Sequence, residues 1–456
     1  MTRNRFLWLV AAVWLVAFSA LGKGWKAGVA KVNITPQQPI WQAGYASRTH
    51  PSDGKLHDLW AKALALEDEK GQRAVLVSSD LLGFPKAMSD RIRQKLSQTL
   101  GLTNAQVLLN SSHTHSGPVL EDALHDIYPL GAPEQAVINA YSQALEKQII
   151  QLVTDAFRKL EPAELYSQNG VTRFQVNRRN NKEGALREQA ELRGPNDYAV
   201  PVIKVVDANG KLKAIAFGYA CHPTVLDLYQ LSGDYAGFAQ IELENSHPGT
   251  TALFFQGAAG DQNPLPRRTV PLARQYGREL AAAVDRVLDE PMQRLDAQLN
   301  TAYSEIPLKL SPGPSVAELT KIAQEKDGYL KRWATRVLRE QQAGKPYLTQ
   351  YAYPVQAWRL GNQPLFSFGG ELVIEYALEV KKRFGLNAFV FGYCNDVMGY
   401  IPSETILKEG GYEGESSQMV YGLPSPWVAG LQQQILAEVE KLAAQAGLPK
   451  PKSLTK

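Results

Sequence analysis

Two of the seven histidines stand two residues apart, in the segment SSHTHSGP of residues 111–118. This segment follows an apolar run, residues 107–109, which we expect to form a buried strand. In an extended chain, residues i and i+2 point to the same side, so His113 and His115 would face one pocket. Such a pair at a strand end can hold or flank a metal ion, or it can be two hydrogen-bonded histidines in a polar turn.

A third histidine lies at the end of another predicted strand. His222 follows the apolar residues 212–217 and is followed by Pro223, which stiffens the chain and fixes the direction of the imidazole. Alone, this histidine would be assigned a structural role. Together with the pair at residues 113 and 115, it gives a metal site the same weight as a structural role.

Two further segments have the same layout, with a predicted strand that runs into a polar turn. Gly369 and Gly370 precede Glu371 at the start of a predicted helix, and glycines allow close approach of the backbone. Alternatively, Glu371 only interacts with the positive end of the helix dipole. The second segment is GYCNDVMGYIP, residues 392–402.

Predicted strands and helices alternate along the chain, which indicates an α/β (α+β) fold. We expect a large, mixed, twisted β-sheet core surrounded by helices in a single catalytic domain. Asn209-Gly210 predicts a tight turn between two strands. The predicted strands are residues 74–77, 107–109, 201–206, 212–217, 251–255, 355–360, 365–368 and 388–391, and the predicted helices are 133–160, 270–287, 316–341, 372–384 and 428–446.

The composition is that of an ordinary globular protein, with 44% hydrophobic and 21% charged residues. The net charge of +4 comes partly from the two ends, and there is no basic stripe with interleaved aromatic residues, so we expect no nucleic-acid partner. The two cysteines, Cys221 and Cys394, are expected to be free and buried, although a disulfide between them is the alternative.

The first residues are typical of a secretory signal. Arg3 and Arg5 precede an uncharged apolar run over residues 6–22, which is at the short limit for a membrane span. We expect a signal peptide at 1–22, one large domain at 23–448 and a basic tail at 449–456. The protein would then be periplasmic or secreted, whereas an uncleaved signal would act as an anchor.

Taken together, the segments resemble the catalytic domain of the neutral/alkaline non-lysosomal ceramidases, from about Val29 to Gly422. The block His113–Pro118 is the most specific element of the resemblance, and the other matching segments are weak one by one. They are Lys31–Pro36, Gly44–Arg48, Asn177–Arg178, His222–Thr224, Gly233–Tyr235, Ala259–Asp261, Gly370–Glu371, Tyr400 and Tyr412–Gly414.

The resemblance implies one catalytic zinc ion per chain. Mapped by motif, its ligands are His113, His222, Glu371 and Tyr400. Two imidazoles, a carboxylate and a phenol oxygen suit a borderline metal such as zinc. Zinc would activate a water molecule to attack an amide carbonyl.

The resemblance also implies catalytic roles for residues around the metal. His115 would face the substrate or support a ligand, and Arg178 would bind a substrate oxygen or developing negative charge. Tyr412 would donate a hydrogen bond from its hydroxyl group within the pocket. The alternatives are a surface ion pair for Arg178 and simple packing for Tyr412.

Two departures from the family bear on the substrate. Asn263 occupies the place of an active-site serine and lacks its hydroxyl group. Only a short stretch follows Gly422, which leaves no length for the β-sandwich domain of the ceramidases. We therefore expect a more soluble substrate if that domain serves contact with lipid.

The predicted function is a zinc-dependent hydrolase that acts on a linear N-acyl amide, with a small molecule or a lipid as substrate. A lipid substrate would bring peripheral contact with a membrane. The alternatives are an ester or a glycan-derived substrate, for which Trp41, Trp358 and Trp427 would stack on sugar, and a catalytically silent ligand-binding protein. The sequence does not indicate the oligomeric state.

Overall fold

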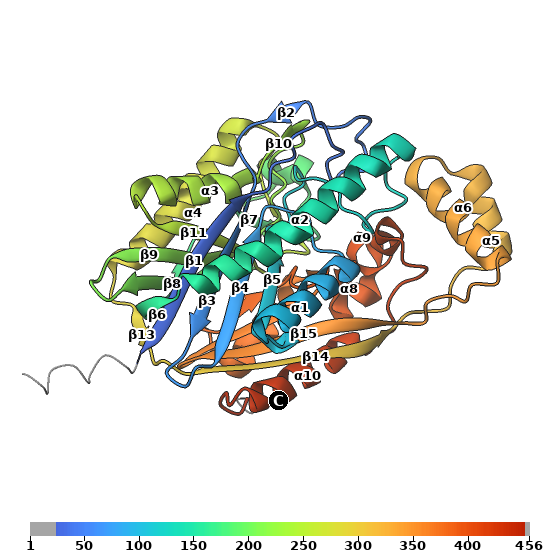
Figure 1. Cartoon of the computed structure of the whole chain (residues 1–456). Coiled ribbons are helices and arrows are strands. Elements are labelled where there is room, and N and C mark those ends of the chain that lie inside the picture. The colour runs from blue at the N-terminus through green and yellow to red at the C-terminus, as the bar shows by residue number, and fades with distance from the viewer. Residues whose placement is uncertain (1–23, 452–456) are drawn as a thin grey trace, which may run out of the picture.

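The computed structural model describes residues 24–451, and its core is formed by two β-sheets that lie face to face (Figure 1). The larger sheet has nine strands in the order β11-β9-β8-β6-β1-β3-β4-β5, with β13 paired to β6. It is mixed, because β4 and β5, and β9 and β11, pair in parallel whereas the other pairs are antiparallel. Its strands are β1 (Trp25–Asn33), β3 (Trp60–Glu67), β4 (Arg73–Ser79), β5 (Val107–Ser111), β6 (Glu161–Val171), β8 (Ala199–Asp207), β9 (Leu212–Tyr219), β11 (Thr251–Gln256) and β13 (Gln293–Leu295).

The smaller sheet has four strands in the order β14-β15-β16-β18 and packs on the inner face of the larger one. Leu76 and Leu108 of the larger sheet share an apolar core with Trp358 and Phe391 of the smaller sheet. Alternate residues on the same strands, such as Val75 and Val77, point outward to the helices, as the two-residue period of a strand requires. The strands are β14 (Leu299–Lys309), β15 (Gln350–Leu360), β16 (Gln363–Phe368) and β18 (Phe389–Phe391).

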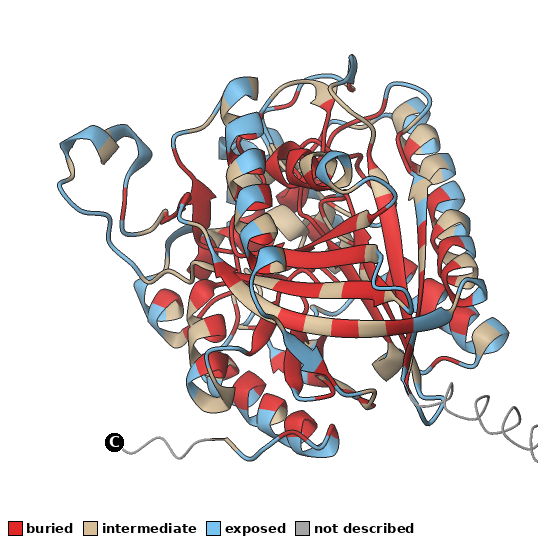
Figure 2. Ribbon diagram, turned by 90° about the vertical axis from the view of Figure 1, so that its left-hand side faces the viewer, coloured by how far each residue is buried: buried red, intermediate tan, exposed pale blue. Residues whose placement is uncertain are grey.

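Helices cover the outer faces of both sheets, which gives four layers. Four of them lie on the larger sheet and two on the smaller one. Figure 2 shows that the strands are mostly buried and that the helices expose only their outward sides. On the larger sheet lie α1 (Lys86–Leu100), α2 (Ala132–Arg158), α3 (Asp234–Ser246) and α4 (Val270–Asp289), and on the smaller sheet lie α7 (Ile374–Phe384) and α10 (Leu431–Gln445).

The remaining elements lie outside the two sheets and the helices that cover them. They include three two-stranded pairs and several helical turns. The pairs are β2 (Gly54–Lys55) with β10 (Gln230–Leu231), β7 (Gln175–Asn177) with β12 (Gln262–Pro264), and β17 (Glu371–Leu372) with β19 (Tyr400–Ile401). The helical segments are η1 (Asn104–Gln106), η2 (Glu183–Glu188), α5 (Val316–Glu325), α6 (Gly328–Gln342), α8 (Glu404–Glu409), α9 (Gly411–Gly414) and η3 (Ser416–Tyr421).

The structure confirms the predicted fold class, and each predicted strand is present. The single helix predicted over 316–341 is wrong: it is two helices, α5 and α6, because the chain breaks at Asp327 and Gly328, where Gly328 has a φ of 66°. The helix predicted from residue 372 begins later, since Glu371 and Leu372 pair with β19. The strands β8 and β9 form the predicted hairpin, with a φ of 79° at Gly210.

Both cysteines are free and buried, as expected. Within residues 24–451, none of the helices combines the length and the apolar character that a bilayer span requires. The predicted signal peptide at 1–22 and residues 452–456 of the predicted tail lie outside the described residues.

Candidate metal centre

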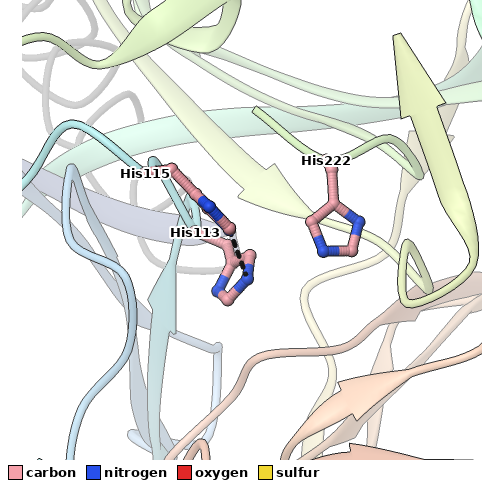
Figure 3. Close-up of side chains that lie close together, drawn as sticks. All are labelled: His113, His115 and His222. Carbon is pink, nitrogen blue, oxygen red and sulfur yellow. Dashed lines mark hydrogen bonds between the residues drawn. The ribbon is translucent and has the colours of Figure 1, made fainter. Parts of the chain in front are cut away.

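Three imidazoles meet at the polar end of the larger sheet. One ring nitrogen from each of His113, His115 and His222 lies within 4.8 Å of the others. Figure 3 shows the rings of His113 and His115 side by side, with His222 facing them from a separate segment. The Nε2 atoms of His113 and His115 are 3.2 Å apart. The three histidines that the sequence analysis singled out therefore lie in one cluster.

The reason given for the shared position of His113 and His115 is wrong, because the chain there is not extended. The strand β5 ends at Ser111, and His113 has a φ of 63°, in the left-handed region. Backbone hydrogen bonds from His113 N to Leu81 O (2.9 Å) and from His115 N to Pro223 O (3.4 Å) hold this turn. The turn, and not alternation along a strand, brings the two rings together.

Backbone carbonyl groups determine which ring nitrogens carry a proton. Nδ1 of His113 lies 2.7 Å from the Leu82 carbonyl oxygen, and Nδ1 of His222 lies 2.6 Å from the Ala259 carbonyl oxygen. A carbonyl oxygen only accepts, so each Nδ1 donates and each Nε2 keeps its lone pair. Both lone pairs point into the site. Metal-bound histidines in proteins are oriented in this way.

Glu371 and Tyr400 complete the cluster from the neighbouring pair of short strands. One oxygen of Glu371, Oε2, lies 2.9 Å from His222 Nε2 and 3.2 Å from His113 Nε2. Tyr400 is the pairing partner of Glu371 across β17 and β19, and its hydroxyl oxygen is 3.4 Å from His222 Nε2. The carboxylate thus belongs to the site, and its role is not limited to the dipole of the following helix.

The predicted glycine effect is seen at Gly370, directly before Glu371. Gly370 has a φ of 69°, and a Cβ atom there would lie 2.7 Å from the Gly399 carbonyl oxygen. Only glycine allows this approach of the two backbones. The close approach places Glu371 beside Tyr400.

Burial favours the neutral form of two of the imidazoles, His222 and His115. Burial lowers the pKa of His222 to about 4 and that of His115 well below its usual value. The Nε2 lone pair of neutral His222 then faces a carboxylate oxygen of Glu371. Such a set of nitrogen and oxygen donors fits a divalent metal ion.

Two tyrosines that the sequence analysis did not single out support Glu371. Tyr421 donates a hydrogen bond to Oε1 of Glu371, and the Tyr393 hydroxyl lies 3.4 Å from Oε2. Tyr393 has a φ of 55°, a conformation that is uncommon for a bulky residue and often marks functional sites. No sequence signal indicated Tyr421, which lies 50 residues beyond its partner.

Arg178 links the cluster to its surroundings. Its guanidinium group donates to the Tyr400 hydroxyl (3.0 Å), to Glu413 (2.7 Å) and to Oδ1 of Asn263 (3.4 Å). The side chain is only 20% exposed, so it does not form an ordinary surface ion pair. Tyr412 is 44% exposed and packs its ring on Tyr400 at a centroid distance of 5.3 Å.

A pocket of about 640 Å³ opens over these residues. His115, Arg178, Asn263, Tyr400 and Tyr412 all contribute to its lining. The structure therefore brings the predicted site residues to one pocket, with His113, His222 and Glu371 buried near it. The tryptophans proposed for sugar stacking are buried, and none is among the described residues that line this pocket; they are Trp41, Trp358 and Trp427.

Comparison with known proteins gives a match to the sequence model described as "Neutral/alkaline non-lysosomal ceramidase, N-terminal" over residues 25–266. The matched region contains the three histidines and ends before Glu371 and Tyr400. Neutral ceramidase B of Dictyostelium discoideum is 29% identical over 245 residues, which cover 49% of this chain and 33% of that protein. Neutral ceramidase of Drosophila melanogaster is 27% identical over 258 residues, covering 53% and 36%. The chain thus matches about a third of the length of these curated relatives.

Solved structures show the same fold over nearly the whole chain. The neutral ceramidase of Pseudomonas aeruginosa superposes with a TM-score of 0.69 at 20% identity, covering 95% of this chain and 76% of that one. A ceramidase complexed with C2 gives a TM-score of 0.71 at 20% identity, covering 95% and 77%.

Proposed function

Because this chain belongs to the neutral/alkaline non-lysosomal ceramidase family, we propose that it is a zinc-dependent hydrolase that acts on linear N-acyl amides. Hydrolysis of such an amide adds one water molecule and yields a carboxylic acid and an amine. The observation that carries the proposal is that His113 Nε2 and His222 Nε2, both with lone pairs available, converge on one carboxylate oxygen of Glu371.

Four side chains would hold the zinc ion: His113, His222, Glu371 and Tyr400. When bound, zinc would polarise the amide carbonyl and favour ionisation of water near neutral pH. The carbonyl groups that accept from Nδ1 of His113 and His222 keep both rings oriented toward the ion. Tyr421 and Tyr393 orient the carboxylate of Glu371 in the same way.

The residues that line the pocket would act on the substrate. Arg178 is permanently charged, and it would bind the substrate carbonyl or the negative charge that develops on it. His115 lines the pocket and its Nδ1 has no hydrogen-bond partner among the described residues, so it would face the substrate or support a ligand. Asn263 and Tyr412 would contact the substrate from the lining of the pocket.

The test combines metal content with turnover. We expect about one zinc ion per chain by mass spectrometry in the wild-type protein and less than a tenth of that in His113→Ala and His222→Ala. Amine release from a panel of N-acyl amides should vanish in both variants. The matched control is His247→Ala, because His247 is a half-buried histidine that pairs with Asp285 outside the pocket.

The same experiment separates the alternatives. A wild-type protein without zinc contradicts the proposed metal centre. Bound zinc without turnover of any amide or ester would instead indicate a ligand-binding protein that has kept the family fold.

Export is part of the proposal, with residues 1–22 as a signal peptide, 23–448 as the hydrolase domain and 449–456 as a basic tail. The apolar run after Arg3 and Arg5 supports it. Mass spectrometry of the protein from its native cells should give a new N-terminus near Lys23 in the periplasmic or secreted fraction. An intact N-terminus in the membrane fraction would indicate an anchor.

A further inference from the structure

The pocket over the candidate metal centre is mostly polar. Besides the residues of the site, its wall consists largely of charged and amide side chains and contains a single aliphatic one, Leu265. The charged residues are five cations, Arg178, Arg179, Lys182, Arg267 and Arg268, and three carboxylates, Glu183, Glu409 and Glu413.

Arginines of the same pocket already neutralise its three carboxylates. Glu413 accepts from Arg178 at 2.7 Å and from Arg179 at 2.8 Å. Glu409 lies 2.7 Å from Arg179, and Glu183 lies 2.8 Å from Arg267.

Two cations of the wall have no carboxylate partner within the pocket. Lys182 forms no ion pair among residues 24–451. The nearest carboxylate to Arg268 is Asp227, at 3.5 Å, and it lies outside the lining. Arg268 also donates to the Tyr45 hydroxyl at 3.1 Å, which holds the guanidinium at the wall. The lining of the pocket, which includes His115, therefore carries more cations than carboxylates.

A long neutral hydrocarbon chain does not suit this wall. It would remove charged groups from water and give them no partner in return, which costs free energy. A separate cavity of about 210 Å³ has a more apolar lining, but it shares no described lining residue with this pocket. An anionic group, in contrast, would find Lys182, which has no ion-pair partner among residues 24–451, and Arg268, whose one carboxylate partner, Asp227, is 3.5 Å away and outside the lining.

We propose that the pocket selects N-acyl amides that carry an anionic group, such as a carboxylate or a phosphate, over neutral lipids such as ceramide. The inference rests on the proposed hydrolase function and specifies its substrate class. The excess positive charge formed by Lys182 and Arg268 provides the selection.

Equilibrium binding tests this without depending on turnover. The probes are N-hexylsulfonyl-L-alanine and its neutral alaninamide analogue, because sulfonamides resist hydrolysis. Calorimetry with the zinc-loaded full chain should show at least tenfold tighter binding of the anionic probe. Salt at about 0.5 M should reduce this preference, since it screens exposed charges. A phosphate probe, N-hexylsulfonyl-phosphoethanolamine, should also bind more tightly than the alaninamide.

Variants test whether the cations of the pocket cause the tighter binding of the anionic probe. The double variant Lys182→Glu, Arg268→Gln should bind the two alanine probes within threefold of each other. The control Arg286→Glu changes an exposed charge on α4 outside the pocket and should keep the wild-type ratio. Equal binding of the two probes by the wild-type protein, tighter binding of the neutral one, or no binding of either overturns the inference. Failure to hydrolyse any amide would contradict the proposed function, whereas the binding ratio would still be measured.

Discussion

Individual residues at the site are held mainly by the backbone of distant segments. The Leu82 and Ala259 carbonyls orient His113 and His222, and the Pro223 carbonyl holds the backbone of His115. These contacts direct the Nε2 atoms of His113 and His222 toward the same neighbour in the site, Glu371. Adding even one methyl group beside an imidazole ring should therefore displace the ring and lower activity.

Gly44 provides such a change. It has a φ of 101°, and a Cβ atom there would lie 2.4 Å from Cγ of His115. Because the imidazole must move, Gly44→Ala should lower the turnover number for an amide substrate at least about tenfold. The control Gly210→Ala has a φ of 79° and open space around the added atom, so it should lose stability but not activity. Equal activity in the two variants would argue against a role for His115.

Asn263 tests the departure from the family at a single residue. It is buried, and its Oδ1 accepts from Arg178 at 3.4 Å. Asn263→Ser restores the hydroxyl that the resemblance places there, so release of sphingoid base from a short-chain ceramide should rise at least about tenfold. Chromatography of the released base is the measurement. The double variant that combines Asn263→Ser with His113→Ala is the inactive control. No gain over the wild type would show that the hydroxyl is not what limits ceramide cleavage.

At the scale of elements, the helical hairpin α5–α6 holds the segment that carries Tyr421. Trp333 of α6 donates to the Leu423 carbonyl at 3.2 Å. Arg336 donates to the Gly422 carbonyl at 3.1 Å and pairs with the buried Asp126 at 2.7 Å. Since Tyr421 donates to Glu371, the hairpin positions the carboxylate of the candidate metal centre indirectly.

Removing Arg336 should therefore affect both stability and the site. Arg336→Ala leaves Asp126 buried without its partner, and we expect a loss of about 2 kcal/mol, because the arginine is 27% exposed. Zinc affinity should also fall, by about tenfold, as Tyr421 loses its anchor. Denaturant unfolding and a zinc competition assay measure the two effects. Arg339→Ala, an exposed position on the same helix, is the control. Unchanged zinc affinity in Arg336→Ala would contradict the positioning role.

Across the whole molecule, the candidate metal centre lies where the two sheets meet. His113 and His222 follow strands of the larger sheet, and Glu371 follows a strand of the smaller one. Asn110 connects the two sheets. Its side chain donates to the carbonyl of Gly392, which follows β18 of the smaller sheet (2.8 Å), and accepts from the backbone N of Gln256 in β11 of the larger sheet (2.9 Å). This junction also buries carboxyl groups, among them Asp396, which accepts from Tyr351 at 2.6 Å.

Asp396 should make stability depend on pH. Burial raises its pKa from 3.8 to about 7, so the folded chain binds this proton more tightly than the unfolded chain. The resulting stabilisation is fully present below about pH 4 and is lost as the pH rises toward 7 and beyond, up to about 4 kcal/mol in total. Asp396→Asn removes the ionisation and keeps an acceptor for Tyr351.

The melting temperature of Asp396→Asn relative to wild type should therefore be higher at pH 8 than at pH 5. Differential scanning calorimetry at both values measures this. A difference between the two proteins that does not change with pH would rule out Asp396 as the titrating group.

Local patterns were enough to predict the fold class, part of the regular elements and the three histidines at strand ends, whereas the other site residues came from the family resemblance. The strands β1, β3, β6 and β14 and the helices α1 and α3 were not predicted. Strands and helices have sequence periods of 2 and 3.6 residues, and the block around His113 and His115 has the composition of a metal-binding turn. Such signals depend on near neighbours, so the sequence alone carries them. They failed at Gly328, where one left-handed residue divides a predicted helix in two.

Only the tertiary structure decided which distant groups meet. Tyr421 reaches Glu371, and Lys182 and Arg268 line the same pocket, although no periodicity relates these positions. The sequence also did not indicate the left-handed turn at His113, nor the carbonyl groups that accept from Nδ1 of His113 and His222. Such contacts depend on how the two sheets pack and on loops that close between them, and these are properties of the folded chain as a whole.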